Sequence, residues 1–343
     1  MKSYYVELYQ KGKARISQEE ICTEDLQDNE AIIQTDFSMV SAGTELSRVF
    51  EIKKGFSYPV RPGYCAVGTV LKKGAGLKDL EVNDKVFFNA PHSSVVRWKH
   101  SDVTQGPQIY KLDKKINPKH ATIINLALVA ISGVNSSEVK LQDNVAVFGL
   151  GNIGILAALM YQKLGANVIA LDPVENRCQL AKKMGLKNVI CKSGDDQITE
   201  IMKLTENRGV EIAVDVTGIS PAIITAINCT RQYGQVILLG SPRQPFETDI
   251  TPVFSRMHMK NLKVIGAFNQ LAPVKEVEGS FNSVTKNYHT VCNLIKNGDI
   301  DVEKFISHTI LPEEVETAYH GLMYDKENYN CVILDWRKYQ SDK

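Results

Sequence analysis

Residues 144–172 decide the fold of this chain and read NVAVFGLGNIGILAALMYQKLGANVIALD. An apolar run typical of a β-strand, residues 145–148, leads into the glycine pattern G-x-G-x-x-G, and a helical pattern over residues 155–164 follows it. A second apolar run, residues 167–171, ends on Asp172, 18 positions after the last glycine. The glycine pattern alone is a weak signal, but strand, turn, helix, strand and terminal acid in this order are what a dinucleotide-binding unit needs.

The three glycines have separate tasks in such a unit. Gly149 permits the tight turn, Gly151 lets the backbone approach a pyrophosphate, and Gly154 lets the helix pack closely on the strand. The N-terminus of the helix then presents N–H groups to the phosphates. We therefore expect the whole loop to bind the cofactor, namely Gly149, Leu150, Gly151, Asn152, Ile153 and Gly154.

The acid at the end of the second strand indicates which nicotinamide cofactor the loop would hold. Asp172 is placed to accept hydrogen bonds from both hydroxyls of the adenosine ribose, and its charge would repel a 2′-phosphate. Arg177 would soften that preference by its positive charge. We expect NAD as the cofactor; the alternative is a glycine-rich turn in an α/β domain that binds nothing.

Strands and helices alternate from residue 145 onward, as a parallel sheet with right-handed crossovers requires. The six predicted strands are residues 145–148, 168–171, 188–191, 212–216, 235–239 and 262–267. Ligands bind at the carboxyl edge of such a sheet. The residues that end the last three strands are therefore further candidates for cofactor contacts: Val216, Thr217, Leu239, Gly240, Ser241, Ala267 and Phe268.

The first part of the chain has a different pattern. Short β-type runs separated by turn residues predict a small barrel-like β domain, with strands at 4–9, 31–40, 66–71, 85–89 and 94–99. A long apolar helix is expected over 120–134, and residues 305–334 return to short β segments around a helix at 312–323. We predict an α/β protein with a first domain at 1–117, a doubly wound domain at 118–280, and a tail at 281–343 that completes the first domain.

Composition excludes several classes of protein. A chain of 343 residues, 43% hydrophobic and 23% charged, is typical of a globular protein with two domains. A formal net charge of +1, without a basic stripe, argues against nucleic-acid and membrane partners. Seven scattered cysteines are typical of free thiols in a reducing compartment, so we expect a cytoplasmic protein.

Five motifs stand in a recognisable order along the chain. They are SAGTE at 41–45, RPGYCAVGTV at 61–70, DVTG at 215–218, GQVILLG at 234–240 and ISHTILPEEVETAYHGL at 306–322. Together with the glycine loop they resemble the medium-chain dehydrogenase/reductase superfamily, nearest its polyol and threonine dehydrogenase and bacteriochlorophyllide dehydrogenase-like branches. The resemblance implies a GroES-like β-barrel catalytic domain beside a Rossmann domain. It also implies a homodimer or a dimer of dimers, paired through the sheet edge at 234–240 and 261–268.

The departures from that family concern zinc. Zinc-dependent members hold the metal with a cysteine, a histidine and, in polyol-type relatives, a glutamate, and the aligned residues here are Ala42, Tyr64 and Asn125. The cysteine lobe that binds structural zinc in many relatives has no counterpart. Because tetrahedral zinc needs at least three protein ligands of the right type, we expect no metal. A residual site built from Cys65, His92 and His100 is the alternative.

Hydride transfer belongs to the nicotinamide, and the protein has to position the substrate and handle a proton. By the resemblance, Thr44 matches a hydroxyl that relays a proton, and Glu45 sits where relatives hold a supporting acid. Tyr64 is a candidate acid/base if its pKa is depressed; the alternative is a core aromatic. We expect Ser41, Asn125 and His92 to add polar contacts to a substrate.

These observations predict a zinc-independent, NAD-linked dehydrogenase for a small-molecule substrate. It would interconvert a secondary alcohol and a ketone on a polyol, sugar, cyclitol or biosynthetic intermediate. Two alternatives stay open, a zinc-free NAD(P)H-dependent enone or quinone reductase and an NAD(H)-binding sensor without turnover. Asp172 counts against the reductase, since those enzymes usually use NADPH, and the polar side chains of Thr44 and Tyr64 count against the sensor.

Overall fold

The chain forms two compact units in this computed structural model, which describes residues 1–52, 55–100, 108–242, 244–278 and 282–340. Unit 1 comprises Met1–Asn125 together with Cys292–Lys343, and unit 2 comprises Leu126–Val291. The chain therefore leaves unit 1, builds unit 2, and returns. Helix α3 (Ile124–Asn135) begins at the first division, and α9 (Val284–Lys296) runs across the second.

Unit 2 contains one six-stranded parallel sheet in the order β10-β9-β8-β11-β12-β13. Its strands are β8 (Asn144–Phe148), β9 (Asn167–Leu171), β10 (Asn188–Ile190), β11 (Val210–Asp215), β12 (Thr230–Leu238) and β13 (Lys263–Gly266). The chain builds outward from β8 to β10 and then from β11 to β13 on the other side of β8. This confirms the predicted doubly wound sheet, because both series start from the centre.

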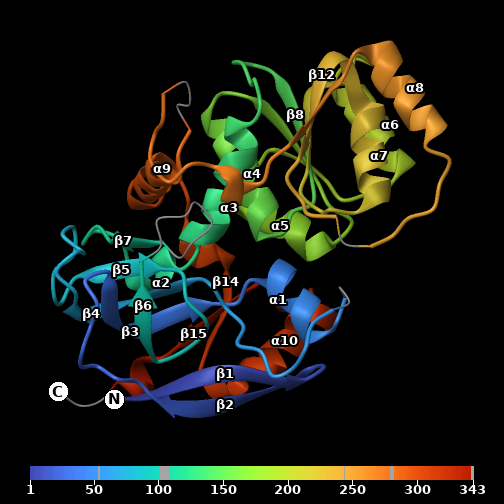
Figure 1. Ribbon diagram of the computed structural model, residues 1–343. Coiled ribbons are helices and arrows are strands. Elements are labelled where there is room, and N and C mark those ends of the chain that lie inside the picture. The colour runs from blue at the N-terminus through green and yellow to red at the C-terminus, as the bar shows by residue number, and fades with distance from the viewer. Residues whose placement is uncertain (53–54, 101–107, 243, 279–281, 341–343) are drawn as a thin grey trace. The chain divides into compact units, whose positions relative to one another are not determined.

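Helices cover both faces of this sheet (Figure 1). They are α4 (Asn152–Lys163), α5 (Glu175–Lys183), α6 (Asp195–Leu204), α7 (Ser220–Cys229) and α8 (Thr251–Lys260). Helices α6, α7 and α8 share one apolar core with the sheet, through side chains such as Ile201, Ile227 and Val253. Helices α4 and α5 pack on β8, β9 and β10 from the opposite face. Strands buried on both faces explain why residues 145–148 and 168–171 are almost entirely apolar.

Unit 1 is built mainly of antiparallel strands. A seven-stranded sheet has the order β14-β15-β3-β4-β5-β7, with β6 also paired to β3, and β1 and β2 form a separate hairpin. These strands are β1 (Lys2–Gln10), β2 (Lys13–Glu20), β3 (Glu30–Met39), β4 (Ala66–Lys73), β5 (Lys85–Phe88), β6 (Val95–Lys99), β7 (Ile109–Lys111), β14 (Ile306–Ile310) and β15 (Cys331–Asp335). Because β15 pairs with β3, the C-terminal segment completes a sheet that the N-terminal segment began.

The helices of unit 1 lie against the hairpin and the sheet. They are α1 (Ala42–Val49), α2 (Pro118–Ala121) and α10 (Val315–Tyr324), with short 3₁₀ turns at Val302–Phe305, Pro312–Glu314 and Arg337–Tyr339. Helices α1 and α10 pack on each other, and both contribute to a core that contains Trp336. Helix α1 was not predicted from the sequence. It forms because Leu46, Val49 and Phe50 recur at helical spacing and bury one face.

No helix among the described residues is long and apolar enough to cross a bilayer.

Two of the loop glycines in unit 2 are required by close approach. Gly149 has φ +97°, which favours glycine, and a Cβ on it would lie 2.8 Å from the Thr217 methyl group. A Cβ on Gly154 would lie 1.8 Å from the carbonyl oxygen of Gly149. Helix α4 therefore sits directly on the turn that follows β8, as the sequence predicted for these two glycines.

We predict that Gly154→Ala destabilises the protein by about 1–3 kcal/mol, because backbone has to shift to admit the methyl group. Denaturant unfolding of the purified variant measures the loss. Gly266→Ala is the matched control, since a Cβ there meets nothing within 4 Å. Its free energy of unfolding should be unchanged or slightly raised. Equal stability of Gly154→Ala and the control would contradict the close packing of α4.

Candidate active site

The glycine loop of unit 2 fits the phosphates of a dinucleotide. Gly151 is the N-cap of α4, with φ −67° and ψ −180°, and a Cβ on it would meet no other atom within 4 Å. Glycine is therefore not needed there for packing, and the space beside it is open to a ligand. The first turn of a helix carries N–H groups without intrahelical partners, which favour anions. Leu150, Asn152 and Ile153 continue this loop into the helix.

Asp172, at the end of β9, holds the glycine loop in place. Its side chain is buried, its Oδ2 accepts a hydrogen bond from the Leu150 N–H at 2.8 Å, and its Oδ1 accepts one from the Val174 N–H at 2.8 Å. The Arg177 guanidinium lies 3.4 Å from Oδ2. A carboxylate oxygen accepts more than one hydrogen bond, so these contacts leave acceptor capacity for a ribose hydroxyl.

The other predicted cofactor positions follow β11, β12 and β13. Val216 and Thr217 come directly after β11, Leu239, Gly240 and Ser241 after β12, and Ala267 and Phe268 after β13. Carboxyl ends of parallel strands share one edge of a sheet, so these residues and the glycine loop lie along the same edge. Ala267 is buried there, whereas the Phe268 side chain is 54% exposed.

Asp215 organises that edge and was not among the predicted site residues. Its buried carboxylate accepts hydrogen bonds from the Thr217 hydroxyl at 2.6 Å and the Gly218 N–H at 2.9 Å. Its carbonyl oxygen accepts from the N–H groups of Leu239 and Gly240. The DVTG motif therefore fixes the turns after β11 and β12 together.

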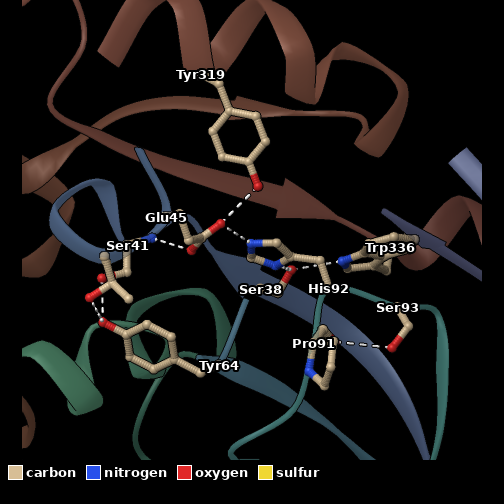
Figure 2. A network of polar contacts seen from close by, with 10 residues as sticks. Ser38, Ser41, Glu45, Tyr64, Pro91, His92, Ser93, Tyr319 and Trp336 are labelled. Carbon is tan, nitrogen blue, oxygen red and sulfur yellow. Dashed lines mark hydrogen bonds and ion pairs between the residues drawn. The ribbon is translucent and has the colours of Figure 1, made fainter. Parts of the chain in front are cut away.

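A cluster of three hydroxyl groups lies in unit 1, at the start of α1. The Ser41 and Tyr64 hydroxyls are in direct hydrogen-bond contact, and the Thr44 hydroxyl lies 3.5 Å from that of Tyr64 (Figure 2). Ser41 is buried, Tyr64 is half-buried and Thr44 is exposed. The sequence placed these residues in the site separately, and the structure brings them together. We call Ser41, Thr44 and Tyr64 the hydroxyl cluster.

The environment of Tyr64 differs from the expected one. Burial raises the pKa of its phenol, and the hydrogen bonds with Ser41 and Thr44 do not offset that effect. The condition of a depressed pKa, under which Tyr64 is a candidate acid/base, is therefore not met: at neutral pH the side chain is an uncharged phenol that carries its proton. Such a group donates a hydrogen bond, or gives its proton to a developing oxyanion.

Glu45 lies beneath the hydroxyl cluster with its carboxylate buried. Its Oε1 accepts a hydrogen bond from the Ser41 N–H at 2.6 Å, and its Oε2 accepts from the Tyr319 hydroxyl at 2.8 Å and lies 3.0 Å from His92 Nε2. Burial alone would raise the pKa of Glu45, but the interactions with His92, Ser41 and Tyr319 outweigh it, so the pKa is lowered. The position fits the expected supporting role and removes Glu45 from direct contact with solvent.

His92 is a further correction to the predicted site. It was expected to contact a substrate, but its side chain is fully buried and both ring nitrogens have partners, Glu45 Oε2 and, at 2.8 Å, Ser38 Oγ. The Trp336 indole N–H in turn donates to Ser38 Oγ at 2.8 Å. Figure 2 shows this chain of contacts running from Trp336 to Glu45. His92 therefore belongs to the support of the site and not to its surface.

The residues in the former zinc positions do not form a ligand set. Ala42 has no donor atom, Tyr64 is protonated, and the Asn125 side chain is hydrogen-bonded to the Cys65 thiol. Burial raises the pKa of that thiol, which opposes the thiolate form that binds metal. Within residues 1–52, 55–100, 108–242, 244–278 and 282–340, no group of three or more histidine, cysteine or acidic side chains is placed to hold a metal ion. The alternative site of Cys65, His92 and His100 therefore does not fit either.

Three members of the network were missed by sequence reasoning: Ser38, Tyr319 and Trp336. Tyr319 stands inside the quoted motif at 306–322, but nothing in the spacing connects it with Glu45, which lies 274 positions away. The packing of α10 on α1, together with the pairing of β15 with β3, brings them together.

Comparisons with known proteins show what this chain is similar to. A family model described as "Zinc-binding dehydrogenase" matches residues 152–283. A D-guloside 3-dehydrogenase from Shigella flexneri is 26% identical over 249 residues, which cover 72% of this chain and 69% of that protein.

Solved structures share the fold over nearly the whole chain. Galactitol-1-phosphate dehydrogenase from Escherichia coli superposes with a TM-score of 0.79 at 18% identity, covering 97% of this chain and 99% of that chain. A zinc-binding dehydrogenase from Sinorhizobium meliloti, solved with NADP bound, has a TM-score of 0.79 at 17% identity, covering 98% and 99%. A further structure of this fold, an alcohol dehydrogenase from Escherichia coli, is a complex with NADH. The five motifs in order, the two units and these matches show that the chain belongs to the medium-chain dehydrogenase/reductase superfamily.

Proposed function

We propose that this protein is an NAD-linked dehydrogenase that interconverts a secondary alcohol and a ketone without a catalytic zinc ion. The observation that carries the proposal is the hydroxyl cluster, which gathers Ser41, Thr44 and Tyr64 at positions in and beside the family's zinc-ligand motifs. The family model does not bear on the metal, because its match begins at residue 152 and Ala42, Tyr64 and Asn125 precede it.

The chemistry divides between the cofactor and the cluster. The nicotinamide supplies or accepts the hydride when it is bound. Tyr64, as a neutral phenol, donates a hydrogen bond to the substrate oxygen and gives up its proton as negative charge develops there. Thr44 is exposed and passes a proton from water to Tyr64, and in alcohol oxidation the same protons move in reverse. A hydrogen-bond donor thus takes the place of a Lewis acid.

The substrate class follows from the polar character of the cluster. Ser41 and Thr44 each present a hydroxyl that both donates and accepts, which suits a substrate with several neighbouring hydroxyl groups. The similarity to a D-guloside 3-dehydrogenase favours the same class. We therefore propose a polyol, a sugar, a cyclitol or a related biosynthetic intermediate as the substrate.

The proposal of NAD rests on Asp172. A 2′-phosphate beside its buried carboxylate would meet a negative charge that the Arg177 guanidinium, at 3.4 Å, neutralises only in part. Asp172 also fixes the glycine loop through Leu150, so its charge cannot turn away from the ribose position.

We also propose a homodimer through the free edge of the parallel sheet. Among the residues that the structure describes, β13 pairs with β12 alone, and Val264, Phe268 and Leu271 are exposed at or beside it. Open strand edges with apolar side chains tend to be paired. A second copy of this chain supplies the matching edge.

We predict that the purified protein, without stoichiometric zinc, oxidises NADH in the presence of some members of a panel of sugar-derived and cyclic ketones. NADH absorbance measures turnover, and elemental analysis measures the metal. One zinc per chain, with activity lost on chelation and restored by zinc, would contradict the metal-free mechanism. NADH binding without turnover on any panel member would favour the sensor.

We predict that Asp172→Asn narrows the preference for NADH over NADPH by about tenfold, because the amide keeps an acceptor for the Leu150 N–H but removes the charge. Fluorescence titration with both nucleotides gives the two dissociation constants. Asp195→Asn, at an exposed acid on α6, is the control and should leave the ratio unchanged. An unchanged ratio in Asp172→Asn would show that this acid does not set the cofactor preference.

We predict that Tyr64→Phe lowers kcat by ~10²-fold or more while the dissociation constant of NADH stays the same. In the wild-type enzyme, ketone reduction should not slow with rising pH up to about 10, because the raised pKa keeps the donating form protonated there. Steady-state rates across pH check both points. Tyr161→Phe removes a buried phenol of unit 2 that contacts Ser137 at 3.1 Å, and it is the control. A Tyr64→Phe variant with full kcat would remove Tyr64 from the mechanism.

A further inference from the structure

The network beneath the hydroxyl cluster joins three separate parts of unit 1 at one carboxylate. Glu45 is on α1, His92 lies in the segment before β6, and Tyr319 is on α10. The side chains of all three are essentially inaccessible to solvent, with relative exposures of 1%, 0% and 0%. Burying polar groups costs free energy unless each one is hydrogen-bonded. The protonation states can therefore be inferred by matching each donor with an acceptor.

The carboxylate fixes the direction of the first two contacts. Three donors converge on the two oxygens of Glu45, which fits an ionised carboxylate that accepts only. Burial and the negative charge of Glu45 raise the pKa of Tyr319, so its hydroxyl is neutral and donates. His92 Nε2, 3.0 Å from the same oxygen, has to carry a proton as well.

The other side of the imidazole fixes the tautomer. The Trp336 indole N–H is a donor only, and it points to Ser38 Oγ at 2.8 Å. The Ser38 hydroxyl then has its own proton to give, and His92 Nδ1 lies 2.8 Å away. With Nδ1 unprotonated, donors run in one direction from Trp336 through Ser38 and His92 to Glu45. With both ring nitrogens protonated, Ser38 would receive two N–H groups and its own proton would have no acceptor in this network.

The arrangement of Ser38, His92 and Glu45 has the order of a nucleophile, a base and an acid, as in hydrolases. Ser38 is fully buried, however, and its oxygen already receives the indole N–H. No substrate carbonyl reaches it. The network therefore acts on the site only through its other end, which is Glu45.

Ser41 connects Glu45, and with it the buried network, to the hydroxyl cluster. Glu45 Oε1 holds the Ser41 N–H at 2.6 Å, and the Ser41 carbonyl oxygen accepts the Glu45 N–H at 2.9 Å. These two contacts fix the backbone of Ser41 from both sides, so its hydroxyl is held against that of Tyr64. Losing a donor on the opposite oxygen of Glu45 frees the carboxylate to turn and releases this constraint.

We propose that His92, as the neutral tautomer protonated at Nε2, and Tyr319 are positioning residues that hold Ser41 and Tyr64 in donor geometry by orienting the Glu45 carboxylate. The role in turnover rests on the proposed function, whereas the tautomer and the orientation of Glu45 do not.

The first test is spectroscopic and needs no substrate. In the full-length protein labelled with ¹⁵N-histidine, at pH 7, the signals lost in His92→Gln identify its two ring nitrogens. We expect one pyrrole-type and one pyridine-type nitrogen, with the pyrrole-type Nε2. Two pyrrole-type nitrogens, or the opposite tautomer, would overturn the assignment whether or not the protein turns over a substrate.

The second test concerns turnover. Tyr319→Phe keeps the ring in the core and removes one donor to a buried carboxylate, so kcat should fall about tenfold or more, with KM and the NADH dissociation constant unchanged. The acidic limb of the pH profile should also move to higher pH, because Glu45 then protonates more easily. A structural loss alone would lower the amount of folded enzyme and leave the pH profile in place.

The variants are compared with a matched control. Tyr58→Phe removes a phenol that also contacts α1, through the Arg48 carbonyl at 3.0 Å, and does not reach Glu45. It should keep kcat within about twofold. At position 92, Gln retains an amide donor at the place of Nε2 and should keep more activity than Asn, which is too short to reach Glu45. Equal kcat in Tyr319→Phe and Tyr58→Phe, or greater activity in His92→Asn than in His92→Gln, would refute the positioning role.

Discussion

The buried carboxylate of Glu45 is the constraint on which the rest of unit 1 depends. An ionised group without contact to water is tolerated only where several donors surround it, and here they come from α1, from the segment before β6 and from α10. Each of these elements is thereby fixed relative to the others by one charge. In this chain the region is held by a polar network, and the phenol of Tyr64 next to it is neutral.

Different interactions fix the geometry of the two units. In unit 2 the geometry comes from backbone packing, with Gly154 pressed on the Gly149 carbonyl and Asp215 joining the turns after β11 and β12. In unit 1 it comes from side chains that satisfy one another in the interior. The family model matches residues 152–283, which lie within unit 2.

The difference between local backbone patterns and long-range side-chain contacts also determined which features could be predicted from the sequence. The six parallel strands, the glycine loop and Asp172 were predictable because each has a local pattern: an apolar run, a glycine spacing or an acid at a strand end. Helix α1 was not predicted, because its first turn is short and lies within the motif at 41–45 without a long apolar pattern. Strand β2 was missed because KARISQEE has no apolar face, and its residues are half-buried or exposed.

The buried residues that support the hydroxyl cluster could not be predicted from local sequence patterns. Tyr319 and Trp336 meet partners 274 and 298 positions earlier, and no periodicity connects residues at that distance. Tyr64 stands in a recognisable motif, but the pKa of its phenol depends on burial in the whole fold and has no local signature. The sequence pattern likewise does not show that the fold encloses His92.

The pairing of β15 with β3 has a consequence for the order in which the protein matures. Unit 2 is contiguous in sequence and has every partner it needs once residue 291 has been synthesised. Unit 1 is incomplete at that point. Glu45 still lacks its partner Tyr319, Ser38 lacks Trp336, and β3 lacks β15, because these partners lie near the end of the chain. On the ribosome unit 2 can therefore fold first, and unit 1 stays incomplete until the last strand has been added.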